Sequence, residues 1–376
     1  MSQRKIFEDA SNATAAPAAR TAIEAPTARK AIRAWLWVLF AMVVAMIAVG
    51  GLTRLTDSGL SITEWRPITG AIPPMNEAAW QAEFDRYRQI DQYRLLNEGM
   101  TLSEFKFIYF WEWGHRQLGR MIGLVWALGF AYFWLRRQIP SGWTGRLLLP
   151  GLLGGVQGAI GWWMVHSGLQ EGMVAVASYR LATHLGLAFV ILGLLAHYAF
   201  LLGRRDADLL QARRNREARL YSMTTGLMHF AFLQILLGAL VAGIDAGRGY
   251  TDWPLMGGAI FPPAMFELEP IWRNFFENDG TVQFIHRVAG YGLAAFGVVV
   301  WLRGRRSAYA VTRRAYHLVL GALAAQILLG IITVMNGALL LLGISHQIVA
   351  VLLWVLIIRA RHFALHPLGG TIRGAA

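Results

Sequence analysis

Long apolar segments, separated by polar and basic loops, follow one another along almost the whole chain. We place eight of them, at residues 32–53, 107–134, 145–165, 179–202, 219–243, 281–302, 316–338 and 344–360. Each is close to the roughly 20 residues that a helix needs to cross a bilayer. Their apolar positions are continuous and do not alternate, which favours helices over a β-barrel. The pattern predicts an all-α polytopic membrane protein with eight transmembrane helices.

Basic residues are divided unevenly between alternate loops. The richer set holds 23 of the 35 Lys and Arg residues and consists of the two terminal segments and the loops near 135–146, 203–219 and 303–314. The poorer set holds 9 and consists of the loops near 53–107, 166–180, 244–280 and 339–343. Basic loops stay on the cytoplasmic side of a membrane. We therefore expect both termini in the cytoplasm and the two long loops, 53–107 and 244–280, outside.

The second half of the chain repeats the first. Residues 112–119 read Glu-Trp-Gly-His-Arg-Gln-Leu-Gly, and residues 283–290 read Gln-Phe-Ile-His-Arg-Val-Ala-Gly. Four spans followed by four, each set starting inside, indicate a parallel repeat about an axis along the membrane normal. We predict two pseudo-symmetric four-helix bundles. The expected units are a disordered tail 1–31, a bundle 32–203, a cytoplasmic linker 204–218, a second bundle 219–360 and a cytoplasmic tail 361–376.

Composition agrees with the membrane assignment. The chain is 56% hydrophobic and 15% charged, whereas a soluble protein carries about 25% charged residues. The net charge of +13 would suit nucleic acid, but the arginines lie in short loops, where membrane topology explains them. We therefore expect a lipid bilayer and no nucleic acid as a partner. The chain has no cysteine, which excludes disulfides and thiolate sites.

Each half places two histidines near the outer ends of its spans. They are His115 and His184 in the first half, and His286 and His346 in the second. A histidine at membrane depth is costly unless it is paired or ligated. Two imidazoles that face each other across a bundle are the axial ligands of a six-coordinate haem. The pattern predicts two haem sites, one in each half, near the periplasmic side.

Neighbouring residues suit a macrocycle. Gly119 and Gly290 lie one helical turn after the histidines of the repeat, on the same face, and leave room for a flat ring. Arg116 and Arg287 are placed to bind haem propionates, although snorkelling toward the interface explains them equally well.

The polar residue three positions before the repeated histidine differs between the halves. Glu112 shares a helical face with His115, and a carboxyl beside a haem can give and take protons. The alternative is a solvated carboxylate at the helix N-terminus. Because the matching Gln283 cannot titrate, we assign the chemistry to the first half and electron relay to the second.

Other polar residues within the spans receive structural interpretations. Packing is assigned to histidines without a counterpart in the repeat, namely His166, His197, His229 and His317. Interhelical hydrogen bonding is assigned to glutamines that precede a glycine by four residues, namely Gln157, Gln234 and Gln326. His362 and His366 fall in the predicted cytoplasmic tail, and we expect them to be solvated.

From about residue 32 to 360 the chain resembles the haem A synthase family. The resemblance rests on Glu-x-x-His-Arg at 112–116, on the four histidines, and on Gly-Leu-Thr-Arg-Leu-Thr-Asp-Ser-Gly-Leu-Ser-Ile-Thr-Glu-Trp at 51–65. It implies an oxidoreductase that converts haem O to haem A for cytochrome oxidase. A ring methyl would be hydroxylated stepwise to a geminal diol, which loses water to give a formyl group. Lacking cysteine, the chain resembles the branch found in mitochondria and related bacteria.

The resemblance also implies a division of labour. The first bundle would bind substrate haem iron through His115 and His184, with Glu112 catalytic. The second would bind the iron of haem b through His286 and His346. An electron-transfer partner and a bacterial inner membrane are implied as well. Contacts with haem O synthase, with cytochrome oxidase assembly factors and with a second copy of the chain stay open.

Two other functions are compatible with the motifs. A di-haem b-type electron carrier would keep both histidine pairs and would not need Glu112. A haem transporter or chaperone would need a site that can face either side of the membrane, whereas all four predicted ligands lie on one side.

Overall fold

The computed structural model describes residues 26–369, and within that range it consists of helices and loops without a strand. The eight longest helices are α1 (Pro26–Leu55), α4 (Leu102–Leu135), α5 (Thr144–Gly168), α6 (Ser178–Leu202), α8 (Ala218–Gly243), α10 (Asp279–Gly304), α11 (Ala310–Met335) and α12 (Leu340–Leu365). All are long and apolar enough to cross a membrane. The prediction of eight membrane helices is confirmed. Most of the predicted tail 1–31, and residues 370–376, lie outside the described part of the chain.

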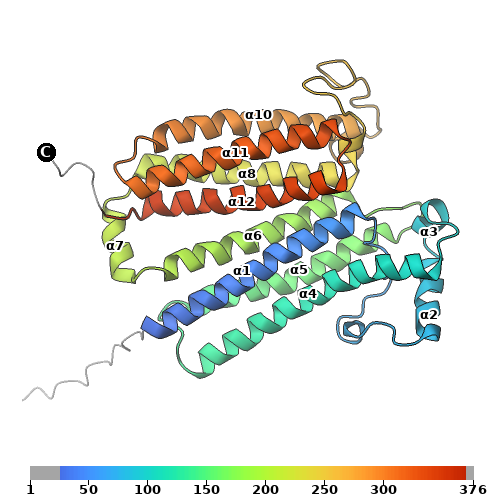
Figure 1. Cartoon of the computed structure of the whole chain (residues 1–376), viewed down its shortest axis with the longest axis horizontal. Coiled ribbons are helices and arrows are strands. Elements are labelled where there is room, and N and C mark those ends of the chain that lie inside the picture. The colour runs from blue at the N-terminus through green and yellow to red at the C-terminus, as the bar shows by residue number, and fades with distance from the viewer. Residues whose placement is uncertain (1–25, 370–376) are drawn as a thin grey trace, which may run out of the picture.

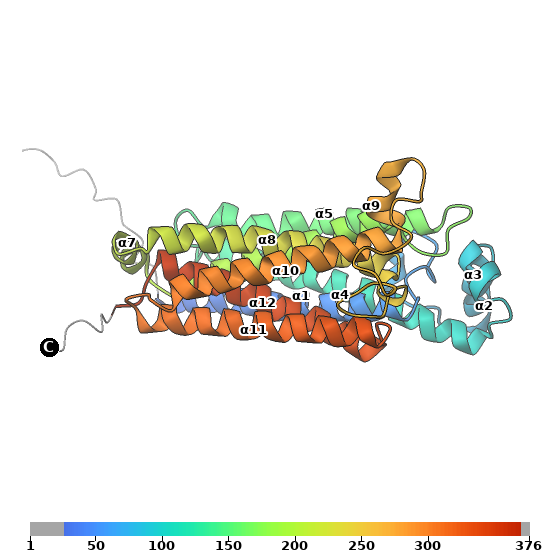
Figure 2. The ribbon, with the colours of Figure 1, turned by 90° about the horizontal axis from the view of Figure 1, so that it is seen from above.

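The eight helices lie side by side in two groups (Figures 1 and 2). In the first group α1 contacts α4 and α6, and α5 contacts α4 and α6. In the second group α8 contacts α10 and α12, and α11 contacts α10 and α12. The groups meet where α6 contacts α8 and α12, and where α1 contacts α12. The same pairs recur in the same order, which supports our inference of two related four-helix bundles.

Several helices extend beyond the predicted apolar spans. A capping box between Thr101 and Glu104 starts α4 five residues before the predicted 107. Charged first turns are also helical, so α11 begins at Ala310 and not at 316. Gly337 and Ala338 adopt positive φ angles of 61° and 54°, and they end α11 before the predicted 338. An apolar span marks the part of a helix that lies in lipid, whereas its hydrogen bonding continues into the interface.

The expected solvation of the C-terminal histidines is wrong. The helix α12 continues to Leu365, and His362 and His366 are only 5% and 7% exposed. His362 packs against Phe200 of α6. The segment that follows α6, which contains helix α7 (Asp206–Arg214), lies at this end of α12 (Figure 1). Arg204 Nη1 donates to the carbonyl of His366 at 2.9 Å. Burial lowers the pKa of His366 to about 4, and the charges of Arg204 and Arg213 add to that effect.

The two long loops that the distribution of basic residues predicts to lie outside, termed the outer loops, lie at the same end of the helices (Figure 2). The first carries the short helices η1 (Thr69–Ala71), α2 (Glu77–Tyr87) and α3 (Asp91–Leu96), and the second carries η2 (Ala246–Arg248), η3 (Ile271–Arg273) and α9 (Asn274–Glu277). At about 1.5 Å per residue, α4 is longer than the roughly 30 Å hydrocarbon core. Its first turns pack against the first loop in a small apolar cluster, which consists of Ile62, Trp80, Phe84, Tyr87, Tyr93, Phe105, Ile108 and Tyr109.

Candidate functional site

The fold brings the predicted histidines together in two pairs. His115 on α4 and His184 on α6 are near neighbours. His286 on α10 and His346 on α12 are near neighbours as well. All four side chains are half-buried. Each half of the molecule therefore offers one pair of imidazoles from two different helices.

Two of the histidines pack directly against glycines of a neighbouring helix. A Cβ added to Gly161 on α5 would lie 2.8 Å from Cε1 of His184. A Cβ added to Gly330 on α11 would lie 2.8 Å from Cε1 of His346. Such contacts are shorter than van der Waals distance, so only glycine lets each ring approach the adjacent backbone this closely.

The other two histidines also lie against a glycine of a neighbouring helix. A Cβ on Gly50 of α1 would lie 3.3 Å from Nε2 of His115. A Cβ on Gly238 of α8 would lie 3.1 Å from Cε1 of His286. Every histidine of the predicted ligand set is therefore seated on a glycine of the helix beside it.

Glutamines hold the histidines of α6 and α12. Gln157 Nε2 donates to the carbonyl of His184 at 2.9 Å and lies 3.2 Å from its Nδ1. Gln326 Nε2 lies 3.3 and 3.2 Å from Nδ1 and Nε2 of His346. The predicted interhelical hydrogen bonds are present. Their partners are the histidines themselves, which the spacing of glutamine and glycine did not reveal.

Of the other two predicted ligands, His115 and His286, only His286 has a glutamine partner. Gln234 on α8 donates to the carbonyl of His286 at 2.9 Å and lies 3.1 Å from its Nδ1. On α1 the residue four positions before Gly50, which matches Gln234 four positions before Gly238, is Met46.

The two histidine pairs suit iron held in a haem better than a metal ion that is bound by protein side chains alone. Each pair supplies two imidazoles, and residues 26–369 contain no group of three or more His, Asp or Glu side chains that could hold a metal ion. A porphyrin supplies the four equatorial nitrogens that such a pair lacks. Haem ligation by the two pairs stays a prediction that these features support.

Glu112 lies inside the protein, with only 2% of its surface exposed. Its Oε2 accepts hydrogen bonds from Ser61 Oγ and from the amide of Ile62, both at 2.8 Å. Its Oε1 accepts two from Arg116, at 3.1 and 2.6 Å. The alternative of a solvated carboxylate at a helix end is wrong. Four hydrogen bonds, two of them from a guanidinium, therefore satisfy both oxygens of this buried carboxyl group.

Arg116 also fixes the start of the first outer loop. Its Nη2 donates to the carbonyl of Ile62 at 2.8 Å, and its Nη1 donates to that of Glu64 at 3.1 Å. The guanidinium lies 5.8 Å from the ring of Trp162. A freely snorkelling side chain would not make these contacts, so Arg116 ties the loop to α4 directly beside His115.

Arg287 repeats this arrangement in the second half. It donates to the carbonyls of Tyr250 at 3.0 Å and Asp252 at 2.9 Å, which match those bound by Arg116. It also donates to Gln283 Oε1 at 3.1 Å. Gln283 in turn donates to the carbonyls of Ala246 at 2.8 Å and Tyr250 at 3.1 Å. The geometry is repeated, but an amide that donates replaces a carboxylate that only accepts.

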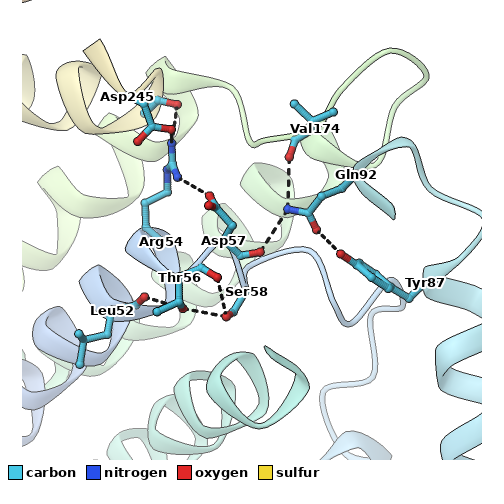
Figure 3. A network of polar contacts seen from close by, with 10 residues as sticks. Leu52, Arg54, Thr56, Asp57, Ser58, Tyr87, Gln92, Val174 and Asp245 are labelled. Carbon is cyan, nitrogen blue, oxygen red and sulfur yellow. Dashed lines mark hydrogen bonds and ion pairs between the residues drawn. The ribbon is translucent and has the colours of Figure 1, made fainter. Parts of the chain in front are cut away.

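The stretch 51–65 links the two halves at their outer ends (Figure 3). Arg54 pairs with Asp245, which follows α8, at 2.7 Å and with Asp57 at 3.0 Å. The carbonyl of Asp57 accepts from Gln92 Nε2 at 3.2 Å, and the same amide donates to Val174 at 3.3 Å. The loop that supplies Ser61 and Ile62 to Glu112 is thus anchored to both halves.

Sequence reasoning missed several residues of the site. Ser61 and the Ile62 amide lie in a stretch that was singled out, but nothing in it indicates contact with Glu112. Gly50 and Met46 lie within an apolar run and carry no polar signal. Their positions become visible only when the repeat is extended from α8 back to α1.

Comparison with known proteins agrees with the motifs. Residues 33–358 match the COX15-CtaA family, described as cytochrome oxidase assembly protein. The chain belongs to this family. It is 68% identical to a haem A synthase of Ruegeria sp. (strain TM1040), with 100% of both chains covered. It is 65% identical to that of Ruegeria pomeroyi over 99% of this chain and 100% of the relative, and 65% identical to that of Paracoccus denitrificans over 92% and 91%. The family predicted from the motifs is confirmed.

Proposed function

We propose that this chain makes haem A from haem O in a bacterial inner membrane, for the assembly of cytochrome oxidase. The observation that carries the proposal is the buried Glu112 beside one histidine pair, in a chain 68% identical over its full length to a haem A synthase. The second pair has Gln283 in the same place. Only the first half therefore combines a pair of candidate iron ligands with an acid–base group.

The two halves would bind different haems. His115 and His184 hold the iron of haem O, the substrate, and His286 and His346 hold haem b. When bound, haem b supplies a centre that can take electrons from the first half. The second half has Gln283 in place of Glu112, and a glutamine side chain neither gives nor takes a proton. This suits a site for electron transfer alone.

Glu112 is the residue that takes protons from the reacting methyl group. Oxidation of a ring methyl through hydroxylated stages to a geminal diol, and then to a formyl group, removes protons at each stage. The two hydrogen bonds from Arg116 fix the orientation of the carboxyl group that accepts the proton. Ser61 Oγ, 2.8 Å from Oε2, holds the second oxygen.

The test is the haem content of cells that make haem O and no haem A of their own. With the wild-type chain we expect haem A in the extracted haems, identified by its mass. Glu112→Gln, which copies the residue of the second half, should lower haem A by roughly 100-fold or more, because general acid–base groups contribute about 10²–10⁴ in rate. Glu98→Gln, at an exposed site, is the matched control and should retain wild-type haem A.

Two outcomes distinguish the proposed function from the proposed role of Glu112. Absence of haem A with the wild-type chain, in cells shown to contain haem O, would mean that the function is wrong. Wild-type levels of haem A with Glu112→Gln would retain the function and remove the role of Glu112.

A further inference from the structure

The four histidines are not held alike. In three cases a glutamine amide nitrogen lies 3.1 or 3.2 Å from the nearest ring nitrogen: Gln157 on His184, Gln234 on His286 and Gln326 on His346. His115 differs, since none of the hydrogen bonds within residues 26–369 reaches its ring. The exception lies in the half that also carries Glu112.

Met46 stands where a glutamine would be expected. In the first half the Met46 methyl group lies 3.5 Å from the point that a Cβ of Gly119 would occupy. In the second half Gln234 Nε2 lies 3.3 Å from the equivalent point at Gly290. The two side chains thus occupy matching places between helices, and one of them cannot form the hydrogen bond that the other forms.

The ring of His115 is also turned differently. Toward Gly50 it presents Nε2 at 3.3 Å, then Cε1 at 3.5 Å and Cδ2 at 4.0 Å. Toward Gly238, His286 presents Cε1 at 3.1 Å, then Nδ1 at 3.6 Å and Nε2 at 3.9 Å. The rings on Gly161 and Gly330 follow the order seen for His286. The missing amide therefore coincides with a changed ring orientation.

A hydrogen bond to the non-ligating nitrogen fixes both the tautomer and the orientation of a ligand imidazole. A glutamine amide can donate through nitrogen or accept through oxygen. The oxygens of Gln157, Gln234 and Gln326 are buried and unpartnered, and so are free to accept from a ring N–H. A thioether sulfur is only a weak acceptor and donates nothing. Loss of such a partner typically costs 10- to 100-fold in metal affinity.

We propose that His115 is the exchangeable axial ligand of the substrate haem, and that Met46 is the positioning residue that makes it so. The inference rests on the proposed function, because it needs a haem that enters and leaves on one side only. Haem O must arrive and haem A must depart in every turnover, whereas haem b stays. The hydrogen-bonded imidazole of His184 can keep the haem bound while the imidazole of His115 dissociates from the iron.

The test uses the purified full-length chain with haem b as the probe in both halves. Excess apomyoglobin takes up released haem, and the absorption spectrum follows the transfer. The wild-type chain should release haem in two phases, the fast one from the first half. Met46→Gln should slow the fast phase by roughly 10- to 100-fold and leave the slow phase unchanged. Met46→Leu, which stays apolar, should keep the wild-type rate.

The reciprocal variant and a spectroscopic measurement guard against a purely structural effect. Gln234→Met should accelerate only the slow phase, by a similar factor. Carbon monoxide added to the reduced wild-type protein should bind one of the two haems, because one axial position can open. Met46→Gln should suppress that binding at the same gas concentration, which a general loss of packing would not do.

Several results would overturn the proposal. They are a single release phase in the wild-type chain, an unchanged fast phase in Met46→Gln, and equal effects on both phases. If Met46→Gln does not fold, the Gln234→Met variant decides. A slow phase that is not accelerated in this variant would also overturn the proposal. Haem extraction from the producing cells tests the function separately. If the producing cells contain no haem A, the proposed function is wrong. The two release rates would still decide whether His115 is held more weakly.

Discussion

Arg116 and Glu112 form an ion pair inside the protein, one helical turn apart, with Nη2 and Oε1 separated by 2.6 Å. The side chain of Glu112 is 3% exposed and that of Arg116 is 19% exposed. The pair joins two opposite charges on neighbouring turns of α4, and Arg116 also ties the first outer loop to α4. It therefore combines a structural role with the proposed proton chemistry, and the two can be separated by substitution.

Arg116→Lys should destabilise the protein by about 1–3 kcal/mol and also lower haem A production. A lysine keeps the charge, but it cannot form both bonds to Oε1 and the bonds to Ile62 and Glu64 at once. Arg116→Ala should cost more, about 3–5 kcal/mol, because it leaves a buried carboxylate unpaired. Thermal unfolding of the purified protein in detergent measures both effects.

The second half supplies the control for that substitution. Arg287 faces Gln283, which is neutral, so Arg287→Ala leaves no buried charge without a partner. We expect Arg287→Ala to cost distinctly less than Arg116→Ala. Equal losses for the two alanine variants would show that loop anchoring, and not the ion pair, dominates.

Gly161→Ala and Gly330→Ala should each reduce haem binding in their own half. The added Cβ would lie 2.8 Å from His184 or His346, so the imidazole must move away from its seat. A displaced ligand should lower haem affinity by roughly 10- to 100-fold. The haem content and absorption spectrum of the purified variants measure the loss.

Two glycines of the same helices serve as controls. A Cβ at Gly158 on α5 or at Gly321 on α11 would meet no atom within 4 Å. Alanine there should keep the full haem content and should favour the helix by up to about 1 kcal/mol. If Gly158→Ala lost as much haem as Gly161→Ala, the contact with His184 would not be the cause.

The membrane helices and the histidine pairs could be predicted because their signals are local or repeated. Apolar runs place the spans, and the matching motifs at 112–119 and 283–290 identify His115 and His286. What could not be predicted depends on helix rotation and on loops that return to the site. Ser61 reaches Glu112 only because the first outer loop folds back onto α4, which no periodicity encodes.

The C-terminal error has a related cause. His362 follows a run that ends near residue 360, so the pattern predicted a tail. The end of α12 is instead bound by hydrogen bonds from Arg204 and Glu217, which lie more than 140 positions away in the chain. Contacts between such distant segments leave no trace in the local pattern of either one.

Arg54 and Asp245 should show a coupling energy of about 0.5–1 kcal/mol in a double-mutant cycle. The pair joins the end of α1 to the segment after α8, and its side chains are 15% and 39% exposed. Asp245→Asn is the suitable partner substitution, because Asp245 has a φ of 54°, which asparagine tolerates. Added salt should reduce the coupling, since partly exposed pairs are screened. A salt-independent coupling would indicate that shape, and not charge, links these segments.

His366 should make the stability of the protein fall as the medium is acidified from about pH 6.5 toward pH 4. Its ordinary pKa is 6.5, and burial lowers the pKa to about 4 in the folded protein. Between those values the unfolded chain binds a proton that the folded protein excludes, so protonation favours unfolding. Above pH 6.5 both states are neutral at this residue, and its effect vanishes. His366→Leu should therefore show a shallower decline in unfolding temperature than the wild-type chain across this range, with the two profiles becoming parallel above it. Parallel profiles throughout would contradict the prediction and would mean that this end of α12 opens to water before His366 is protonated.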